Sequence, residues 1–278
     1  MKYYRPETTA QLFTLLTDIP ANRRTLLAGG TDLLPRYENG SALPDNLIDL
    51  KKIPDFCGIT EFSDRIEIGA LTTIEILKNN ALVRDHFHGL WLATTQFAGV
   101  QIRHRATLGG NIVNASPAGD TLPALYAHRA KLRLIGPTAE REVAIADFIS
   151  GPGKTITRED EILQAVILPK SAGFSTFYKL GLRQTMAISV VNFALVGKIM
   201  SGGFTNLTIA AGAVAPTVKY LFRFSTTVVQ EGRSLGDSID LVDADIAPID
   251  DIRASADYRR RALKNVLVFT LQELVNKG

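Results

Sequence analysis

The stretch RATLGGNIVNASPAGDTLPAL, residues 105–125, is the most informative part of this sequence. It contains a glycine pair in the segment TLGGN, residues 107–111, and then runs through small and polar residues as far as Asp120. A structureless loop of this length is uncommon in a compact domain and is often functional where it occurs. We interpret the stretch as backbone packed against something flat or extended, with a plain surface loop as the alternative.

A second glycine pair lies upstream, in LLAGGTDLLP, residues 26–35. It directly follows an apolar run that is typical of a buried strand, and glycines there allow positive φ and close approach of a ligand. Exposed amides in such a turn form a nest that suits phosphate oxygens, while Thr31 offers a hydroxyl donor and Asp32 an acceptor. The Rossmann fingerprint and the P-loop are absent, and no helix is expected to begin at this turn. One such turn is usually only a turn, but two with flanking threonines predict a diphosphate site.

The rest of the first 170 residues predicts alternating helices and strands. Helices are expected at residues 8–18, 72–79 and 81–98, the last ending near Gly99. Strands are expected at residues 25–30, 46–50, 65–71, 131–136 and 160–169. This order indicates small α/β units.

After Pro169 the character of the sequence changes, so a domain boundary is expected near residue 170. Three strand-like runs, at residues 174–180, 188–200 and 205–217, predict a small antiparallel sheet. A final stretch, residues 254–277, has apolar residues near helical spacing and predicts the longest helix.

Composition narrows the class of protein. The chain has 278 residues, 46% hydrophobic and 21% charged, which is an ordinary globular balance. A net charge of +3 gives no reason to expect nucleic acid or a membrane surface as a partner. A single cysteine, Cys57, excludes internal disulfides and an iron–sulfur cluster ligated by this chain alone. The start lacks an apolar signal core and no run is long enough to span a membrane, so we expect a soluble cytoplasmic protein.

Four blocks of the sequence resemble, in order and spacing, the flavin subunit of the molybdenum hydroxylases. The blocks are AGGTDLLP (28–35), QIRHRATLGGNIVNASPAGDTLPAL (101–125), GPGKTITREDEIL (151–163) and FYKLGLRQTMAIS (177–189), with RASADYR (253–259) as a later match. The family includes xanthine, carbon monoxide and nicotinate dehydrogenases. The resemblance implies an α+β protein, with a two-subdomain α/β FAD-binding domain of the vanillyl-alcohol-oxidase-like type over residues 1–170, divided at about residue 57. A C-terminal domain with a three-stranded antiparallel sheet and helices is implied for residues 171–278.

The resemblance also implies FAD-binding residues, with the diphosphate held by backbone amides of both glycine turns. The first turn supplies Leu26, Leu27, Ala28, Gly29, Gly30, Thr31, Asp32 and Leu33. The second supplies Thr107, Leu108, Gly109, Gly110 and Asn111. Outside the turns, the matched positions are Phe97, Asp120, Leu163 and Lys179.

Several of these positions have simpler readings. Phe97 and Leu163 suit a hydrophobic core, Asp120 suits a helix N-cap, and Lys179 suits a solvated surface. By the resemblance, Asp120 holds hydroxyl groups of the cofactor. Leu163 and Lys179 lie near the isoalloxazine ring, where a lysine can stabilise negative charge on reduction.

The implied function is electron transfer without catalytic side chains or a metal on this chain. Electrons are expected to pass from [2Fe-2S] clusters on an iron–sulfur subunit, through FAD, to NAD+ or another acceptor, while a molybdopterin-binding large subunit hydroxylates the substrate. We expect a xanthine dehydrogenase-like complex. The alternatives are the flavin subunit of a carbon monoxide, nicotinate or aldehyde dehydrogenase, a self-contained flavoprotein oxidase, and a non-catalytic assembly module.

Two local features bear on the acceptor side and on metals. Arg183 is expected either to help position the acceptor or to form a surface ion pair. Where several family members carry acidic residues, this chain has Gln184, Thr185 and Met186. The four histidines, His86, His88, His104 and His128, show no metal-ligand spacing.

Overall fold

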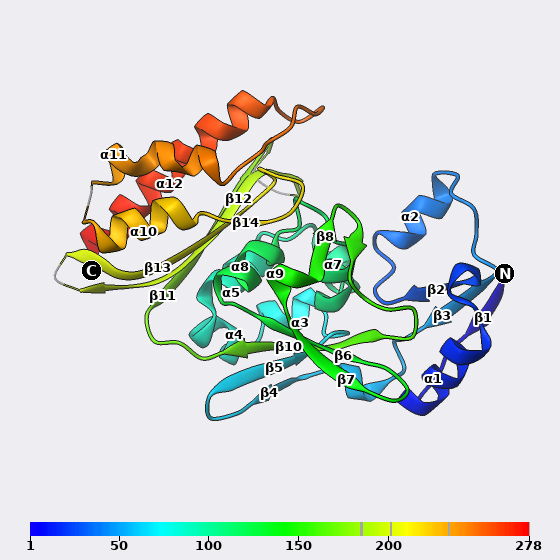
Figure 1. Cartoon of the computed structure of the whole chain (residues 1–278). Helices are drawn as coiled ribbons and strands as arrows, with labels where there is room; N and C mark the ends of the chain where they lie inside the picture. Colours follow the sequence, from blue (N-terminus) through cyan, green and yellow to red (C-terminus); the bar gives the residue numbers. More distant parts are fainter. Residues whose placement is uncertain (184–185, 201, 233, 278) are drawn as a thin grey trace.

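A computed structural model describes residues 1–183, 186–200, 202–232 and 234–277. At the N-terminal end of the molecule lies a three-stranded parallel sheet of order β1-β3-β2 (Figure 1). Its elements are β1 (Lys2–Tyr4), α1 (Thr9–Asp18), a short turn of helix at Ala21–Arg23, β2 (Arg24–Leu27), α2 (Leu33–Glu38) and β3 (Asn46–Asp49). Thr8 caps α1 by accepting from the Gln11 amide, and Leu12 and Leu16 bury one face of the helix. The predicted helix and strands of this part are confirmed, but α2 begins directly after the first glycine turn, where no helix was expected.

The next unit is built on a five-stranded antiparallel sheet of order β4-β5-β10-β6-β7. Its strands are β4 (Ile59–Glu61), β5 (Arg65–Gly69), β6 (Lys131–Ile135), β7 (Glu140–Ala144) and β10 (Ile162–Pro169). A small hairpin, β8 (Ile149–Gly151) and β9 (Lys154–Thr155), lies beside it, and a helical turn at Pro54–Phe56 precedes it. The helices are α3 (Ile74–Lys78), α4 (Ala81–His86), α5 (His88–Thr95), α6 (Val100–Arg103), α7 (Leu108–Val113), α8 (Thr121–Ala127) and α9 (Ile145–Phe148).

The single helix predicted over residues 81–98 is wrong. The chain forms α4 and α5 instead, because Phe87 between them has φ −133° and ψ 56°, outside the helical region. Phe87 is fully buried, and its ring packs edge-on against His128 with 5.0 Å between ring centroids. Tertiary packing therefore breaks a segment whose apolar pattern alone is continuous.

The C-terminal unit is a four-stranded antiparallel sheet of order β11-β12-β13-β14. The strands are β11 (Phe174–Gly181), β12 (Ser189–Met200), β13 (Gly203–Gly212) and β14 (Lys219–Tyr220). Three of them match the predicted runs, and the two-residue β14 adds a short edge. The helices are α10 (Phe222–Gln230), α11 (Leu235–Ser238), a 3-10 helix at Ile239–Ala244, and α12 (Ala256–Lys277).

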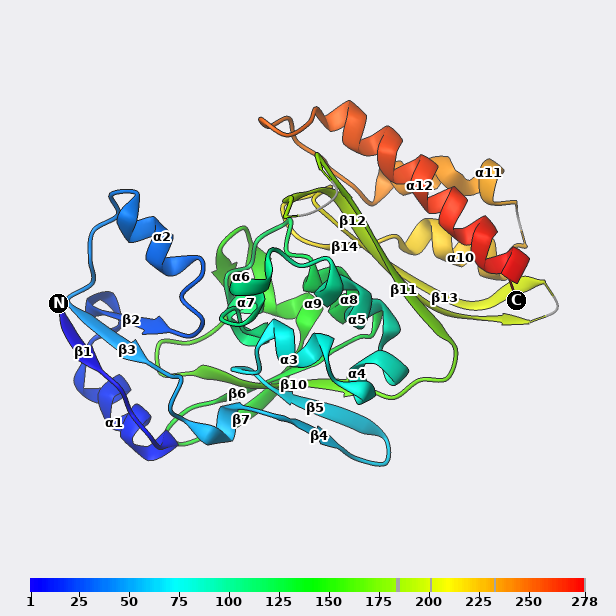
Figure 2. The same cartoon turned by 180° about the vertical axis from the view of Figure 1, so that it is seen from behind.

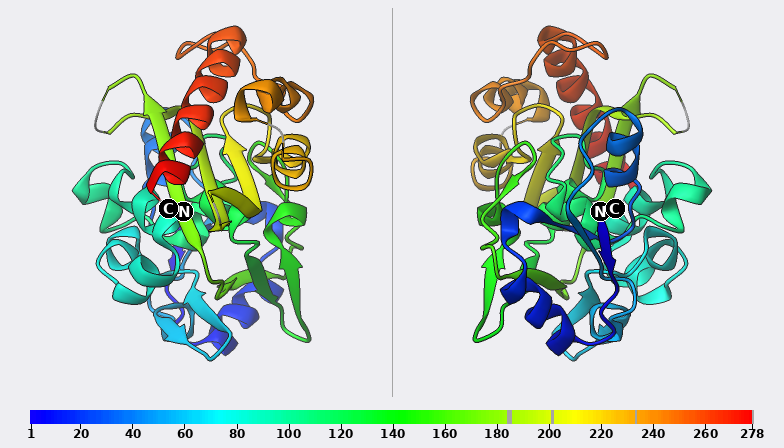
Figure 3. Two further views of the ribbon diagram at one scale, coloured as in Figure 1. Left: turned by 90° about the vertical axis from the view of Figure 1, so that its left-hand side faces the viewer. Right: turned by 90° about the vertical axis from the view of Figure 1, so that its right-hand side faces the viewer.

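These units stack in layers, and both faces of the C-terminal sheet are covered. Figures 1 and 2 show helices α3 to α9 between the five-stranded sheet and the C-terminal sheet, with α10 to α12 on the far side. The end-on views in Figure 3 show α12, drawn in red, lying across that sheet. Residues 189–195 of β12 are consequently all buried, as expected for a strand covered on both faces. Leu263, Leu267 and Leu271 of α12 recur every four residues and are fully buried against it.

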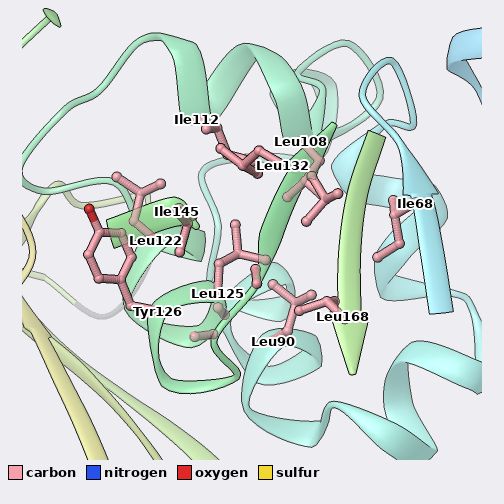
Figure 4. Close-up of a cluster of buried hydrophobic side chains, with 14 of the residues drawn as sticks. Ile68, Leu90, Leu108, Ile112, Leu122, Leu125, Tyr126, Leu132, Ile145 and Leu168 are labelled. Atoms are coloured by element: carbon pink, nitrogen blue, oxygen red, sulfur yellow. The ribbon is translucent and has the colours of Figure 1, made fainter. Parts of the chain in front are cut away.

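The largest hydrophobic core joins the middle helices to both sheets. Figure 4 shows Leu90 and Leu125 from the helices packed near Leu132 and Leu168 of the five-stranded sheet. The same core includes Phe177 and Ala194 of the C-terminal sheet. The five-stranded sheet, the middle helices and the C-terminal sheet therefore share one packed interior.

Candidate functional site

The two glycine turns meet at one cleft. Gly29 lies so close to the second turn's leading segment that an added Cβ would fall 2.2 Å from the Arg105 carbonyl oxygen and 2.9 Å from Ala106 Cα. Only glycine permits this contact, since real Cβ atoms do not approach backbone so closely. The sequence pattern therefore brings together segments that are about 75 residues apart, one from each proposed subdomain.

The cleft has a volume of about 320 Å³, within the range of small-molecule sites. Among the predicted residues it is lined by Leu26, Leu27, Ala28, Gly29, Gly30, Thr31, Asp32, Leu33, Phe97, Thr107, Gly109, Gly110, Asn111 and Leu163. Sequence reasoning missed further wall residues: Arg36, Leu50, Ala70, Leu71, Ala106, Val113, Asn114 and Ile162. Leu108 is fully buried and does not line it.

The first turn has the features of an anion nest. Gly30 has φ +79°, a conformation that side chains disfavour. Within the described part of the chain, no residue accepts a hydrogen bond from the main-chain amides of Gly29, Gly30 or Thr31. Unpaired donors on a cleft wall are costly unless water or a ligand satisfies them. This turn can therefore receive phosphate oxygens.

The second turn differs from the expectation. The Leu108 amide donates to the Thr72 carbonyl at 3.0 Å and the Gly109 amide to the Ala70 carbonyl at 2.8 Å. The Gly110 amide donates to Thr107 Oγ1 at 3.0 Å, which makes Thr107 the N-cap of α7. The described residues thus form no second open amide nest here, because the loop after β5 and the Thr107 side chain supply the acceptors. The glycines allow close packing here, since a Cβ on Gly109 would lie 2.6 Å from Ala70 Cβ.

Phe97 is held at the cleft by a buried arginine. Arg103 Nη1 donates to the carbonyls of Phe97 at 3.0 Å and Ala98 at 3.1 Å, and Ala98 has the strained φ of +37°. Arg103 Nε donates to Glu75 Oε2 at 2.8 Å, with both side chains 12% exposed. This guanidinium contact lowers the pKa of Glu75 to about 2. Sequence reasoning missed both residues, since nothing local marks a pairing of residues on α3 and α6.

Asp120 and Lys179 lie together, away from the cleft lining. Lys179 Nζ donates to Asp120 Oδ2 at 2.6 Å and to the Gln96 carbonyl at 3.1 Å. The two side chains are 7% and 10% exposed. Asp120 makes no side-chain cap bond at α8. Asp120 thus stands at the N-cap position of α8 without capping through its side chain, and the solvated position considered for Lys179 is wrong.

The residues around Lys179 form a separate hollow of about 300 Å³. It is lined by Gln96, Lys179, Leu180, Gly181, Arg183, Met186 and Ala187. Arg183 Nη2 donates to the Met186 carbonyl at 2.7 Å, a bond to backbone that the sequence did not suggest. Gln184 and Thr185 lie outside the described residues.

The described residues contain no group of three or more metal-ligating side chains. His128 is buried on α8's C-terminal end, and burial lowers its pKa to about 4, so it is neutral. No described helix is long and apolar enough to cross a membrane.

The residues of the cleft fit a dinucleotide with a flat ring system. The unpaired amides of the first turn suit a diphosphate, and the apolar walls, such as Leu71 and Leu163, suit an aromatic ring. Asp32 and Arg36 are the charged residues of the wall, and they form an ion pair with each other. The donor set thus fits FAD better than a compact, highly charged ligand.

Comparison with known proteins gives the family. Residues 1–171 match the family model described as FAD binding domain in molybdopterin dehydrogenase, and residues 176–274 match the CO dehydrogenase flavoprotein C-terminal domain. The xanthine dehydrogenase FAD-binding subunit of Escherichia coli O157:H7 is 31% identical over 98% of this chain and 95% of its own length. The nicotinate dehydrogenase FAD-subunit of Eubacterium barkeri is 32% identical over 73% of this chain and 70% of its own.

A solved structure, reconstituted CO dehydrogenase from Oligotropha carboxidovorans, matches with a TM-score of 0.93 at 27% identity, covering 100% of this chain and 98% of that one. This similarity extends over the α+β fold of the whole chain, as the resemblance implied. It agrees with the matches to both family models. The chain belongs to the FAD-binding subunits of the molybdenum hydroxylases, a family of oxidoreductases.

Proposed function

We propose that this chain passes electrons through FAD within a xanthine dehydrogenase-like complex, and that NAD+ is the acceptor. The observation that carries the binding site is the meeting of both glycine turns at one cleft, with the amides of Gly29, Gly30 and Thr31 unpaired among the described residues. FAD supplies, when bound, the ability to exchange electrons singly or in pairs.

The residues of the chain have binding and positioning roles in this proposal. The first turn binds phosphate oxygens through its amides. The second turn lets backbone approach closely and presents Asn111, whose Oδ1 accepts from Thr121 Oγ1 at 2.7 Å. Phe97 and Leu163 form apolar walls. Lys179 of the Asp120–Lys179 pair donates to the carbonyl of Gln96, the residue before Phe97. Electron transfer needs no general acid or base, so no side chain is assigned a catalytic role.

The relatives support the proposed substrate and partners. The match to the Escherichia coli xanthine dehydrogenase subunit spans nearly the full length of both chains and favours a purine hydroxylase. We propose an iron–sulfur subunit and a molybdopterin-binding large subunit as partners, and the cytoplasm as location. The boundary near residue 170 is supported by the two family matches, which end at 171 and resume at 176.

FAD titration of the purified chain tests the proposed site. Gly110→Val should weaken FAD binding at least about tenfold, because its Cβ would lie 2.8 Å from Thr107 Oγ1 and 3.7 Å from Ala28 Cβ, where the turns meet. Gly236→Val is the matched control, since nothing lies within 4 Å of its Cβ position. Equal FAD affinity of Gly110→Val and the unmodified chain would refute the site.

Copurification of the chain with its native partners tests the complex. The proposal expects an iron–sulfur subunit and a large molybdenum subunit that oxidises xanthine, with NADH formed in proportion. A complex active on carbon monoxide or nicotinate, and not on purines, would refute the substrate assignment and leave FAD binding untouched.

A further inference from the structure

We infer that Ser189 and Asn192 are positioning residues for the FAD site, acting through the buried Asp120–Lys179 pair. The inference rests on the proposed function, and it assigns to the C-terminal sheet a role in shaping a cleft that lies in the FAD-binding domain. Both residues are at the start of β12 and are fully buried.

The carboxylate of Asp120 is held on both oxygens. Its Oδ1 accepts from Ser189 Oγ at 2.6 Å and from Asn192 Nδ2 at 3.2 Å, while Oδ2 accepts from Lys179 Nζ at 2.6 Å. Asn192 Nδ2 also donates to Ser189 Oγ at 3.3 Å. A buried ion pair is favourable only if further hydrogen bonds satisfy its charges. Ser189 and Asn192 supply those bonds and fix the direction in which Oδ2 points.

Two hydrogen bonds link this cluster to the cleft wall. Lys179 Nζ donates to the Gln96 carbonyl, and the following residue, Phe97, lines the cleft. Thr121, next in the chain after Asp120, donates from Oγ1 to Asn111 Oδ1, and Asn111 also lines the cleft. A displaced Asp120 would therefore remove one support of Phe97, beside the two Arg103 bonds, and one support of Asn111.

Strand β12, which carries Ser189 and Asn192, is itself held in place by Arg259 of α12. Arg259 Nη1 donates to the Val190 carbonyl at 2.6 Å and to the Ala213 carbonyl at 3.1 Å, and Nη2 donates to Asp251 at 2.7 Å. On the other side, the Ala213 amide donates to the Pro117 carbonyl at 2.8 Å, three residues before Asp120.

Gly212 removes the remaining freedom of the cluster. A Cβ there would lie 2.3 Å from Asn192 Oδ1, and that oxygen accepts no hydrogen bond from the described residues. A buried acceptor without a donor is costly. The orientation that leaves Asn192 Oδ1 in this state is the one in which Asn192 Nδ2 donates to Asp120. The cluster is thus held in one arrangement by backbone on both sides.

The test is Ser189→Ala, which removes the 2.6 Å bond to Asp120. The control is Ser225→Ala, also a buried serine, whose Oγ donates to the Phe222 carbonyl on α10. FAD affinity is measured by quenching of flavin fluorescence, and stability by the thermal unfolding midpoint. We expect Ser189→Ala to weaken FAD binding about fivefold, the size of effect that follows from losing one ordinary hydrogen bond, while Ser225→Ala leaves the affinity unchanged.

A double-mutant cycle separates positioning from general destabilisation. In the charge-free background Asp120→Asn/Lys179→Gln, Ser189→Ala should change FAD affinity by less than about twofold, because it acts through the pair. If Ser189→Ala does not fold, Ser189→Cys, with a weaker donor of similar shape, takes its place in the cycle.

The outcomes are distinct. An equal loss of affinity in both backgrounds, or no loss in either, overturns the inference and leaves the proposed function standing. Failure of the unmodified chain to bind FAD refutes the proposed function itself, and the inference with it.

Discussion

The ion pair between Glu75 and Arg103 allows a quantitative prediction about the wall of the cleft. Glu75→Gln keeps the shape of the side chain and removes its charge. Arg103 then loses a charge-assisted bond of 2.8 Å, while its bonds to the Phe97 and Ala98 carbonyls remain. We expect the variant to fold and to be less stable than the unmodified chain at neutral pH.

The magnitude follows from the pKa of Glu75, which Arg103 foremost, with Asn79 and Lys78, lowers from 4.5 to about 2. At about 1.4 kcal/mol per pKa unit the shift corresponds to at most about 3.4 kcal/mol. Solvent reaches the side chain, which is 12% exposed, so we expect about 2 kcal/mol. Because folding lowers this pKa, the contribution is complete above the unfolded value and is lost as pH falls from 4.5 toward 2.

Urea denaturation at pH 7, 4 and 3 measures this contribution as the difference between the unmodified chain and Glu75→Gln. About three quarters of the difference should remain at pH 4 and less than half at pH 3. A difference that stays constant from pH 7 to pH 3 would refute the reasoning, since it would show that charge is not what Glu75 contributes.

Two further substitutions test the interior. Arg259→Met should destabilise the chain by about 3 kcal/mol. It removes one arginine partner of Asp251 and the guanidinium donor of the Val190 and Ala213 carbonyls. A chemical-denaturation midpoint like that of the unmodified chain would contradict this. Between pH 7 and 4.5 the unmodified chain should lose about 2–3 kcal/mol of unfolding free energy that His128→Leu does not lose. The folded pKa of His128, about 4, lies below the ordinary 6.5, so the unfolded chain takes up the proton first as the pH falls. Parallel pH profiles of the two proteins, measured by urea unfolding, would count against that account.

The elements of the fold were largely predictable, because a continuous apolar run closed by a proline, such as residues 162–169, is itself typical of a buried strand. The break at Phe87 was not, since no proline lies near it and the nearby glycine, Gly89, lies inside α5. Its cause is the packing of that ring against His128, 41 residues away in the chain.

Most of the residues that the sequence proposes for the site line one cleft, but their hydrogen bonding could not be predicted. The glycine pairs predicted both turns. The carbonyls of Ala70 and Thr72, which accept from amides of the second turn, could not be predicted from the local sequence. Likewise, Lys179 and Asp120 are 59 residues apart, and their pairing depends on the docking of the C-terminal sheet. Long-range contacts of this kind have no signature in single-sequence patterns.

The contact of Gly29 with the Arg105 carbonyl has a consequence for biosynthesis. The walls of the cleft come from as early as Leu26 and as late as Leu163, so a ribosome must release most of the chain before any binding surface is complete. A prosthetic group can therefore meet all of its walls only late in synthesis, and a translation product truncated before Leu163 would lack part of them.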